Sequence, residues 1–290
     1  MSGAGRRWAG ALGLAAALLA LHPALAHERV VFPSLDPPNG PPVMLVGHWF
    51  AASAVGAPAG AIALFHGCGG AYDRQGALDR RMRDYTVWLH ERGWSVLVVD
   101  SLGPRGEKET CTQRTGHRRV TQANRRRDAL AAIDWLAQRT DVNPLRIGLI
   151  GWSNGGSTVL AATNVRHPDV AASTARPAFA VAFYPGCEAE RTRGYEPDAP
   201  LLVLVGEADD WTPAAACHRL AADGGPDVEI EGYARAYHGF DSTQPVRLRR
   251  DVPNGVRPGQ GVHVGGDAEA LRRSRERLGT FLARFQPSPR

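Results

Sequence analysis

The stretch GWSNG at residues 151–155 places Ser153 between two glycines, after the apolar run RIGLI and before a segment of small residues. This spacing matches G-x-S-x-G, which predicts a sharp strand-to-helix turn that exposes a serine hydroxyl as a nucleophile. A plain tight turn without chemistry is the alternative. The apolar strand before the turn and the helix expected directly after it favour a catalytic Ser153.

A serine hydroxyl is a weak nucleophile, so it needs a general base and an acid that orients the base. Where a serine occupies this kind of turn, the acid and then the histidine follow it along the chain. The apolar run PLLVLVG at residues 200–206 leads into Asp209 and Asp210. We take Asp209 as the acid and keep Asp210 as the alternative, since either carboxylate could instead cap the helix expected from Pro213.

Two of the ten histidines are candidates for the base, because His238 and His263 both follow the acid along the chain. His238 comes directly after the last expected strand and is the preferred base. His263 lies in a long irregular insert at 242–266 and ranks second. His66 ends an earlier strand, where a structural, hydrogen-bonded role is expected instead of catalysis.

An oxyanion hole requires two backbone N–H groups that point at one position. Asn154, the residue after the nucleophile, is expected to supply the first. The second is expected from the glycine-rich turn HGCGG at residues 66–70, with Cys68 or Gly69 as the donor. A loose glycine turn without this role is the alternative for the segment.

Short apolar segments alternate with helical ones along the chain. The expected strands are VMLVGHWFA, GAIALF, WSVLVVD, RIGLIGW, AFAVAF, PLLVLVG and VEIEGY. The expected helices are DYTVWLHERG, RRVTQANRRRDALAAIDWLAQRT, the segment from Gly155, AACHRLAAD and DAEALRRSRERLGTFLARF. This alternation predicts an α/β fold with a mostly parallel sheet and helices on both faces. Chemistry then gathers at the carboxyl ends of the strands, which Ser153, Asp209 and His238 all follow.

The chain of 290 residues carries a formal charge of +5, of which two arginines near its start supply two. The basic cluster at residues 118–127 has no interleaved aromatic residues, so we interpret it as the solvated face of a helix and expect no nucleic-acid partner. No C-x-x-C pair is present, and we predict neither a metal site nor a cofactor. The sequence indicates no particular oligomeric state.

Residues 1–26 are typical of an export signal, because two arginines precede an apolar stretch and the small-x-small site ALA suits cleavage before His27. A membrane anchor is the alternative, but the apolar run is shorter than the roughly 20 residues of a spanning helix. We therefore predict a single domain over 27–290, periplasmic or secreted, with no stable membrane anchor. Four cysteines in an exported chain suggest two disulfides, with three possible pairings.

Six motifs occur in one order along the mature region: LFHGCGG, VLVVDSLGPRG, GWSNGG, YPGC, LVLVGEADDWTP and YHGF. In this order they resemble the dienelactone hydrolase family of α/β-hydrolases. The resemblance implies the acid at Asp209, four residues before Pro213, the base at His238 and the second oxyanion N–H at Cys68. The namesake enzymes use a cysteine nucleophile, whereas this chain has Ser153, so it looks more like the exported serine members.

The resemblance also implies substrate-binding residues. The namesake holds the carboxylate of its substrate with arginine, which points to Arg105 in the comparable loop SLGPRG. Trp152, next to the nucleophile, is the second candidate for contact with the substrate.

The resemblance bears on the cysteines as well. In the α/β-hydrolase arrangement the strand before Cys68 neighbours the strand before Cys111, and the strand that ends at Cys187 neighbours the one before the helix of Cys217. This implies the disulfides Cys68–Cys111 and Cys187–Cys217, each tying an active-site loop to its neighbour. Four reduced thiols are the alternative.

Together these candidates predict a serine hydrolase that cleaves a carboxylic ester or lactone, a small-molecule substrate, through an acyl-enzyme. A peptidase or an acyltransferase on the same fold is the first alternative. A non-catalytic binding protein with this fold is the second, and a complete set of Ser153, Asp209 and His238 in the right order argues against it.

Overall fold

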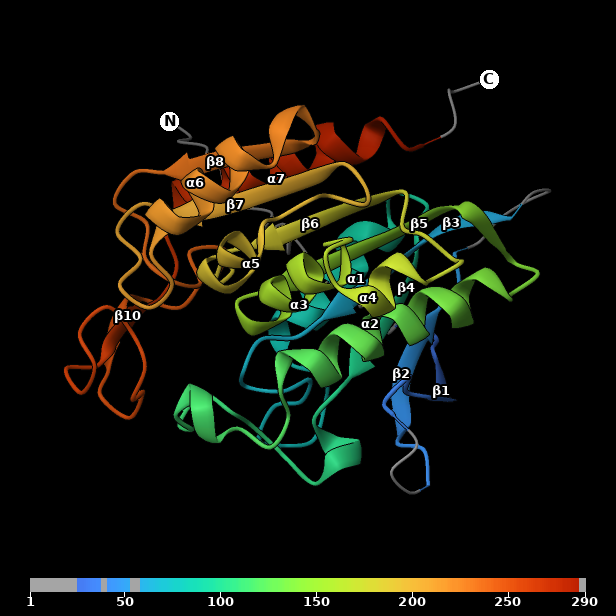
Figure 1. Cartoon of the computed structure of the whole chain (residues 1–290), viewed down its shortest axis with the longest axis horizontal. Coiled ribbons are helices and arrows are strands. Elements are labelled where there is room, and N and C mark those ends of the chain that lie inside the picture. Colours follow the sequence, from blue (N-terminus) through green and yellow to red (C-terminus); the bar gives the residue numbers. More distant parts are fainter. Residues whose placement is uncertain (1–24, 38–40, 53–57, 287–290) are drawn as a thin grey trace, which may run out of the picture.

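The computed structural model describes residues 25–37, 41–52 and 58–286. A central sheet of eight strands has the order β1-β2-β4-β3-β5-β6-β7-β8 (Figure 1). Strands β3 to β8 are mutually parallel, and β1 and β2 join one edge antiparallel. This confirms the predicted mostly parallel sheet. The strands span Glu28–Pro33 (β1), Met44–Phe50 (β2), Ala59–Phe65 (β3), Ser95–Asp100 (β4), Val142–Trp152 (β5), Phe179–Phe183 (β6), Leu201–Gly206 (β7) and Val228–Tyr233 (β8).

Helices cover both faces of the sheet because the central strands are apolar on both sides. In β5, for example, Leu149 belongs to one core cluster and its neighbour Ile150 to the other. Buried residues of α2, α3 and α6 belong to the first cluster, and buried residues of α1 and α7 belong to the second. The helices span Arg80–His90 (α1), Gln122–Ala137 (α2), Asn154–Ala162 (α3), Pro168–Ala171 (α4), Glu188–Arg193 (α5), Ala214–Asp223 (α6) and Ala268–Ala283 (α7).

Local sequence sets the starts of the long helices. Thr121 caps α2 and exchanges hydrogen bonds with Asn124 in a capping box, so the helix starts after the first arginines of the basic cluster. Asp79 and Asp267 accept hydrogen bonds from backbone N–H groups in the first turns of α1 and α7.

One strand was missed, and two predictions need correction. β1 was not predicted, and it forms an antiparallel edge with β2. The insert at 242–266 is not wholly irregular, because it contains the paired strands β9 (Arg247–Arg249) and β10 (Val262–Val264). The basic cluster is not a solvated face throughout: Arg125 is 1% exposed and Arg126 9% exposed.

The predicted export signal falls almost entirely in residues 1–24, which lie outside the described residues. Within the described ranges, no helix is long and apolar enough to cross a membrane. The same part of the chain contains no group of three or more His, Cys, Asp or Glu side chains that could hold a metal ion.

Candidate active site

Ser153 occupies the turn between β5 and α3. Its φ of 55° is unusual for a residue with a side chain, and such strain is retained where the surrounding structure enforces it. The enforcement comes from close backbone contacts. A Cβ on Gly151 would collide with the backbone of Gly155, and one on Gly155 would collide with the carbonyl of Phe65 at the end of β3. The glycines of the motif therefore let α3 pack directly against the end of β3.

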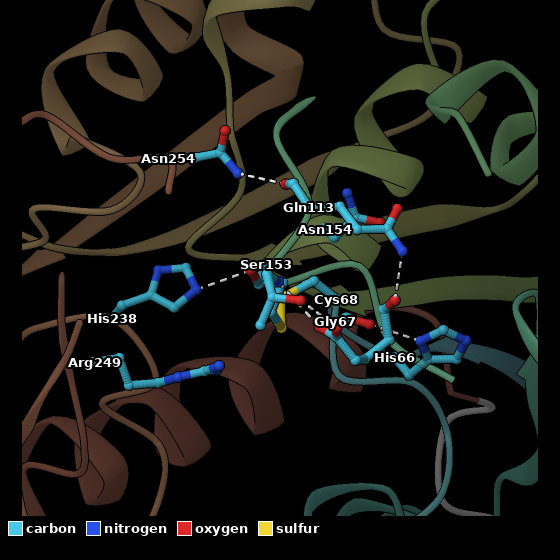
Figure 2. The surroundings of a disulfide bond; sticks show 12 residues. His66, Gly67, Cys68, Gln113, Ser153, Asn154, His238, Arg249 and Asn254 are labelled. Carbon is cyan, nitrogen blue, oxygen red and sulfur yellow. Dashed lines mark hydrogen bonds between the residues drawn. A yellow bond between two sulfur atoms is a disulfide. The ribbon is translucent and has the colours of Figure 1, made fainter. Parts of the chain in front are cut away.

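His238 lies between Ser153 and Asp209. Its Nε2 is 2.8 Å from Ser153 Oγ, and its Nδ1 is 2.8 Å from Asp209 Oδ2; the first of these contacts is drawn in Figure 2. The carboxylate of Asp209 also accepts hydrogen bonds from the backbone N–H groups of Trp211 and Thr212. Both the imidazole and the carboxylate are almost fully buried, so water does not compete for these contacts.

Aromatic rings hold the imidazole from two sides. The rings of Tyr184 and Trp211 lie 4.7 and 4.6 Å from the ring of His238, measured between centroids. Tyr184 is itself fixed, because its hydroxyl donates to buried Asp241 at 2.7 Å and Asp241 pairs with Arg81 at 3.1 Å. None of these supporting residues was predicted, and no local motif distinguishes them.

The alternative acid and the alternative base pair with each other. His263 Nδ1 lies 2.7 Å from Asp210 Oδ2, and the backbone N–H of His263 donates to Asp210 Oδ1 at 2.8 Å. Both side chains are partly exposed. This pair fastens β10 to the loop after β7, and neither residue lines a cavity that contains Ser153.

His66 has the structural role that was expected. It is fully buried, and burial together with the nearby cation of Arg125 lowers its pKa to about 3, so the imidazole is neutral. Its Nδ1 donates to the carbonyl of Gly67, and its Nε2 accepts from the backbone N–H of Ser101.

The two predicted oxyanion residues lie beside Ser153. Asn154 begins α3, and Cys68 follows β3 in a turn that contacts the strand-to-helix turn at residues 151–155, called the elbow, since a Cβ on Gly67 would lie 3.6 Å from Ser153 Cβ. Cys68 and Asn154 line the same cavity as Ser153. The carbonyl of Cys68 accepts from the N–H of Thr110 at 2.7 Å, which holds the turn in place.

Two cavities meet at Ser153. The larger, about 370 Å³, is lined by residues that include Arg118, Trp211 and Asn254, and the smaller, about 170 Å³, by residues that include Arg249. Asn254 and Arg249 come from the insert at 242–266, and the side-chain amide of Asn254 donates to the carbonyl of Gln113 (Figure 2). Sequence reasoning missed them because the insert has no periodic pattern.

The substrate-binding role predicted for Arg105 does not fit the structure. Arg105 lines neither cavity at Ser153, because its guanidinium is bound by Asp36 at 2.6 Å and by Asp128 at 2.8 Å. Arg105 therefore joins Asp36, in the segment after β1, to Asp128 of α2. Trp152 lines the smaller cavity at Ser153, although its side chain is fully buried and stacks on Phe183, so its contact with the substrate stays a prediction.

Both disulfides implied by the strand order are present in the structure. Cys68–Cys111 joins the oxyanion turn to the loop after β4, with the Cα atoms 4.9 Å apart. Cys187–Cys217 joins the loop after β6 to α6, with the Cα atoms 5.1 Å apart. Each bridge restrains a loop beside Ser153.

Reduction of these bridges is expected to lower the free energy of unfolding by about 2–4 kcal/mol each, because the unfolded chain regains the freedom of the closed loops. Urea unfolding of the oxidised protein, of the reduced protein and of the double variants Cys68→Ser/Cys111→Ser and Cys187→Ser/Cys217→Ser measures each contribution. An unchanged unfolding midpoint in fully reduced protein, with four thiols counted, would contradict the expectation.

Solved structures of other proteins share this fold. The apo form of Thermogutta terrifontis esterase 2 aligns with a TM-score of 0.62 at 21% identity, covering 92% of this chain and 97% of that one. The dienelactone hydrolase-like promiscuous phosphotriesterase P91, from metagenomic libraries, aligns with a TM-score of 0.61 at 20% identity, covering 90% and 99%. Likeness at this identity shows a shared fold.

Curated relatives match shorter stretches. An uncharacterized protein of Mycobacterium tuberculosis is 29% identical over 194 residues, which are 62% of this chain and 63% of the relative. YfhR of Salmonella typhi is 33% identical over 133 residues, 42% of this chain and 40% of the relative. The chain therefore spans less than two thirds of the length of these relatives.

A family model matches a longer part of the chain and identifies its family. The model of the dienelactone hydrolase family covers residues 50–285, which include β3 to β8, the elbow at Ser153 and the loops of Asp209 and His238. With this fold and this match, the chain belongs to the dienelactone hydrolase family.

Proposed function

We propose that this protein is a serine hydrolase that cleaves a carboxylic ester or lactone of a small molecule. The observation that carries the proposal is the continuous series of contacts from Ser153 Oγ through His238 to Asp209, with the serine on a strained strand-to-helix turn. Nucleophile, base and orienting acid in hydrogen-bond distance are the parts that activate a serine.

In the proposed reaction, His238 Nε2 accepts the proton of Ser153 as Oγ attacks the carbonyl carbon of the substrate. The N–H groups of Asn154 and Cys68 donate to the oxygen that becomes negative. When the C–O bond breaks, His238 donates the proton to the leaving alkoxide, and the acyl group stays on Ser153. Water, deprotonated by His238, then attacks the acyl-enzyme. As the bond between the acyl group and Ser153 Oγ breaks, His238 returns this proton to Oγ, and the carboxylic acid leaves. In a lactone the leaving alkoxide remains part of the acyl group.

The cavities and the solved neighbours support a small substrate. The larger cavity at Ser153, about 370 Å³, has room for a short acyl or alcohol group. Thermogutta terrifontis esterase 2, which shares the fold, is known with propionate and with butyrate bound and phosphorylated by paraoxon. We therefore propose short acyl esters as the first substrates to examine.

Arg118 replaces Arg105 as the arginine proposed to contact an anionic substituent of the substrate. It lines the larger cavity together with Ser153, and its Nε is buried without a hydrogen-bond partner. Glu109 is the nearby carboxylate that acts on its charge, but no carboxylate among the described residues lies within ion-pair distance of it. Arg118→Gln is expected to raise KM about tenfold for an ester with a terminal carboxylate, and to change KM little for a neutral ester of the same length. Equal effects on both esters would contradict this role.

The proposed function is tested with a fluorophosphonate probe and a panel of p-nitrophenyl esters, lactones and peptide amides, because only an activated serine is labelled. Labelling at Ser153, found by peptide mapping, together with hydrolysis of esters or lactones is the expected result. Faster cleavage of amides would favour a peptidase, transfer to an added alcohol an acyltransferase, and absence of labelling a binding protein.

We also propose that the protein works in an oxidising compartment, periplasmic or secreted. All four cysteines form disulfides, which persist outside the reducing cytosol. Amino-terminal sequencing of the protein expressed with its own amino terminus is expected to begin at His27, and a chain that retains residues 1–26 would contradict cleavage there.

A further inference from the structure

Arg125 is a buried arginine behind the candidate oxyanion hole. It lies on α2, is 1% exposed, and is among the largest side chains that are fully buried. Its Nη1 donates to Asn154 Oδ1, and its Nη2 donates to the carbonyl oxygen of His66 at 2.7 Å. No carboxylate in the described part of the chain lies within ion-pair distance of its guanidinium.

A cation at this position is costly for stability. Burial lowers the pKa of Arg125 to about 10, although the nearby carboxylates of Asp128 and Asp100 act to raise it, so the side chain is still charged at neutral pH. A buried charge without a close counter-ion destabilises the fold relative to an apolar residue of similar volume. Packing alone therefore does not explain an arginine at this position.

The two contacts of Arg125 join the two segments that must converge on the oxyanion. Asn154 carries the N–H after the nucleophile, and His66 is two residues before Cys68, which carries the other N–H. Gln122, three residues before Arg125 and on the same side of α2, donates to the carbonyl of Asn154 at 3.1 Å. One turn of α2 thus holds both the start of α3 and the end of β3.

We propose that Arg125 is a positioning residue that sets the relative placement of the Asn154 and Cys68 N–H groups through its planar, two-armed guanidinium. The inference rests on the proposed function, which assigns the oxyanion to these groups. A guanidinium presents donors in a rigid fork, so it fixes two acceptors relative to one another, which a single ammonium cannot do. Loss of Arg125 then lowers transition-state stabilisation and leaves ground-state binding nearly unchanged.

The test compares Arg125→Met with Arg126→Met. Methionine keeps an unbranched side chain of similar length in the core, and Arg126 is the matched control, because it is a buried arginine on the same helix that pairs with Asp169 at 2.9 Å and contacts neither loop. On a neutral p-nitrophenyl ester, Arg125→Met is expected to lower kcat about 10- to 100-fold at nearly constant KM, below the 10²–10³ typical of losing an oxyanion donor outright. Arg126→Met is expected to keep kcat within about threefold.

A transition-state analogue separates positioning from general damage. A trifluoromethyl ketone that forms an oxyanion adduct with the serine should lose affinity for Arg125→Met by the same factor as kcat/KM, while inhibition by the carboxylic acid product should not change. Arg125→Met that folds with wild-type kcat, or Arg126→Met with an equal loss, would overturn the inference. So would a loss of affinity for the product equal to that for the ketone.

Two further variants keep the test decisive if Arg125→Met does not fold. Asn154→Ala removes the side-chain acceptor and keeps the backbone N–H, so it is expected to lower kcat at least about fivefold, and unchanged kcat would reject the role of the contact. Arg125→Lys keeps the charge and loses the fork, and full activity in it would also reject the proposal. Ser153→Ala in the same assay tests the proposed function separately. If Ser153→Ala stays active, the proposed function fails. If Ser153→Ala is inactive and Arg125→Met is fully active, only the role of Arg125 is refuted.

Discussion

Ser153→Ala is expected to lower kcat on a hydrolysed ester by at least about 10⁴-fold, because the variant has no atom that can form the acyl-enzyme. The remaining rate would come from the oxyanion donors acting on water. The alanine variant should fold normally, since Ser153 Oγ contacts only His238 among the described side chains. Initial rates with the wild-type and variant proteins, each checked by thermal unfolding, measure the effect.

Ser157→Ala is the matched control for this prediction. Ser157 lies one turn further along α3, and its hydroxyl accepts a hydrogen bond from the N–H of Gly186 at 2.8 Å. Its loss is expected to cost about 1 kcal/mol of stability and at most a few-fold in kcat. Ester hydrolysis by Ser153→Ala at a rate within tenfold of the wild type would reject Ser153 as the nucleophile.

Asp209→Asn is expected to lower kcat by about 10³–10⁴-fold, while Asp210→Asn changes it only a few-fold. An asparagine amide at position 209 can donate to His238 Nδ1, which places the imidazole proton on Nε2, the atom that must accept the proton of Ser153. Asp210 contacts His263 and not His238, and that pair is partly exposed, so its neutralisation costs at most about 1 kcal/mol of stability.

Measuring kcat and KM for both variants decides between the adjacent carboxylates. Thermal unfolding serves as the control, because Asp209→Asn retains an oxygen that can accept from the N–H groups of Trp211 and Thr212. A larger loss in Asp210→Asn than in Asp209→Asn would transfer the acid to position 210.

The fold and the location of the site were predictable from local patterns. Apolar runs separated by helical segments indicate a parallel sheet, and such a sheet collects the loops after its strands at one edge. Ser153, Asp209 and His238 each follow a different strand, and G-x-S-x-G has a backbone requirement of its own: glycines where α3 presses on β3. Each strand, each loop and the G-x-S-x-G motif is recognised from a few neighbouring residues, so the sequence predicts them without knowledge of packing.

The choice between neighbouring candidates depended on the tertiary structure. Asp209 and Asp210 are adjacent, and both His238 and His263 follow them, so order along the chain does not pair them. The direction of each side chain in the loop after β7 decides the pairing: the buried carboxylate of Asp209 reaches His238, and the more exposed one of Asp210 reaches the insert.

The arginines illustrate the same limit of local pattern. Sequence reasoning made the cluster at 118–127 a solvated face and Arg105 a substrate contact, whereas the structure buries Arg125 between two active-site loops and binds Arg105 to Asp36 and Asp128. The periodic spacing of apolar residues shows which side of a helix or strand is buried, but it does not show where a charged side chain points. The partners of these arginines come from segments far away in the chain, so local pattern does not predict them. The sequence alone thus determined the sheet, the elbow and the order of the catalytic candidates, and the tertiary packing decided which charges meet.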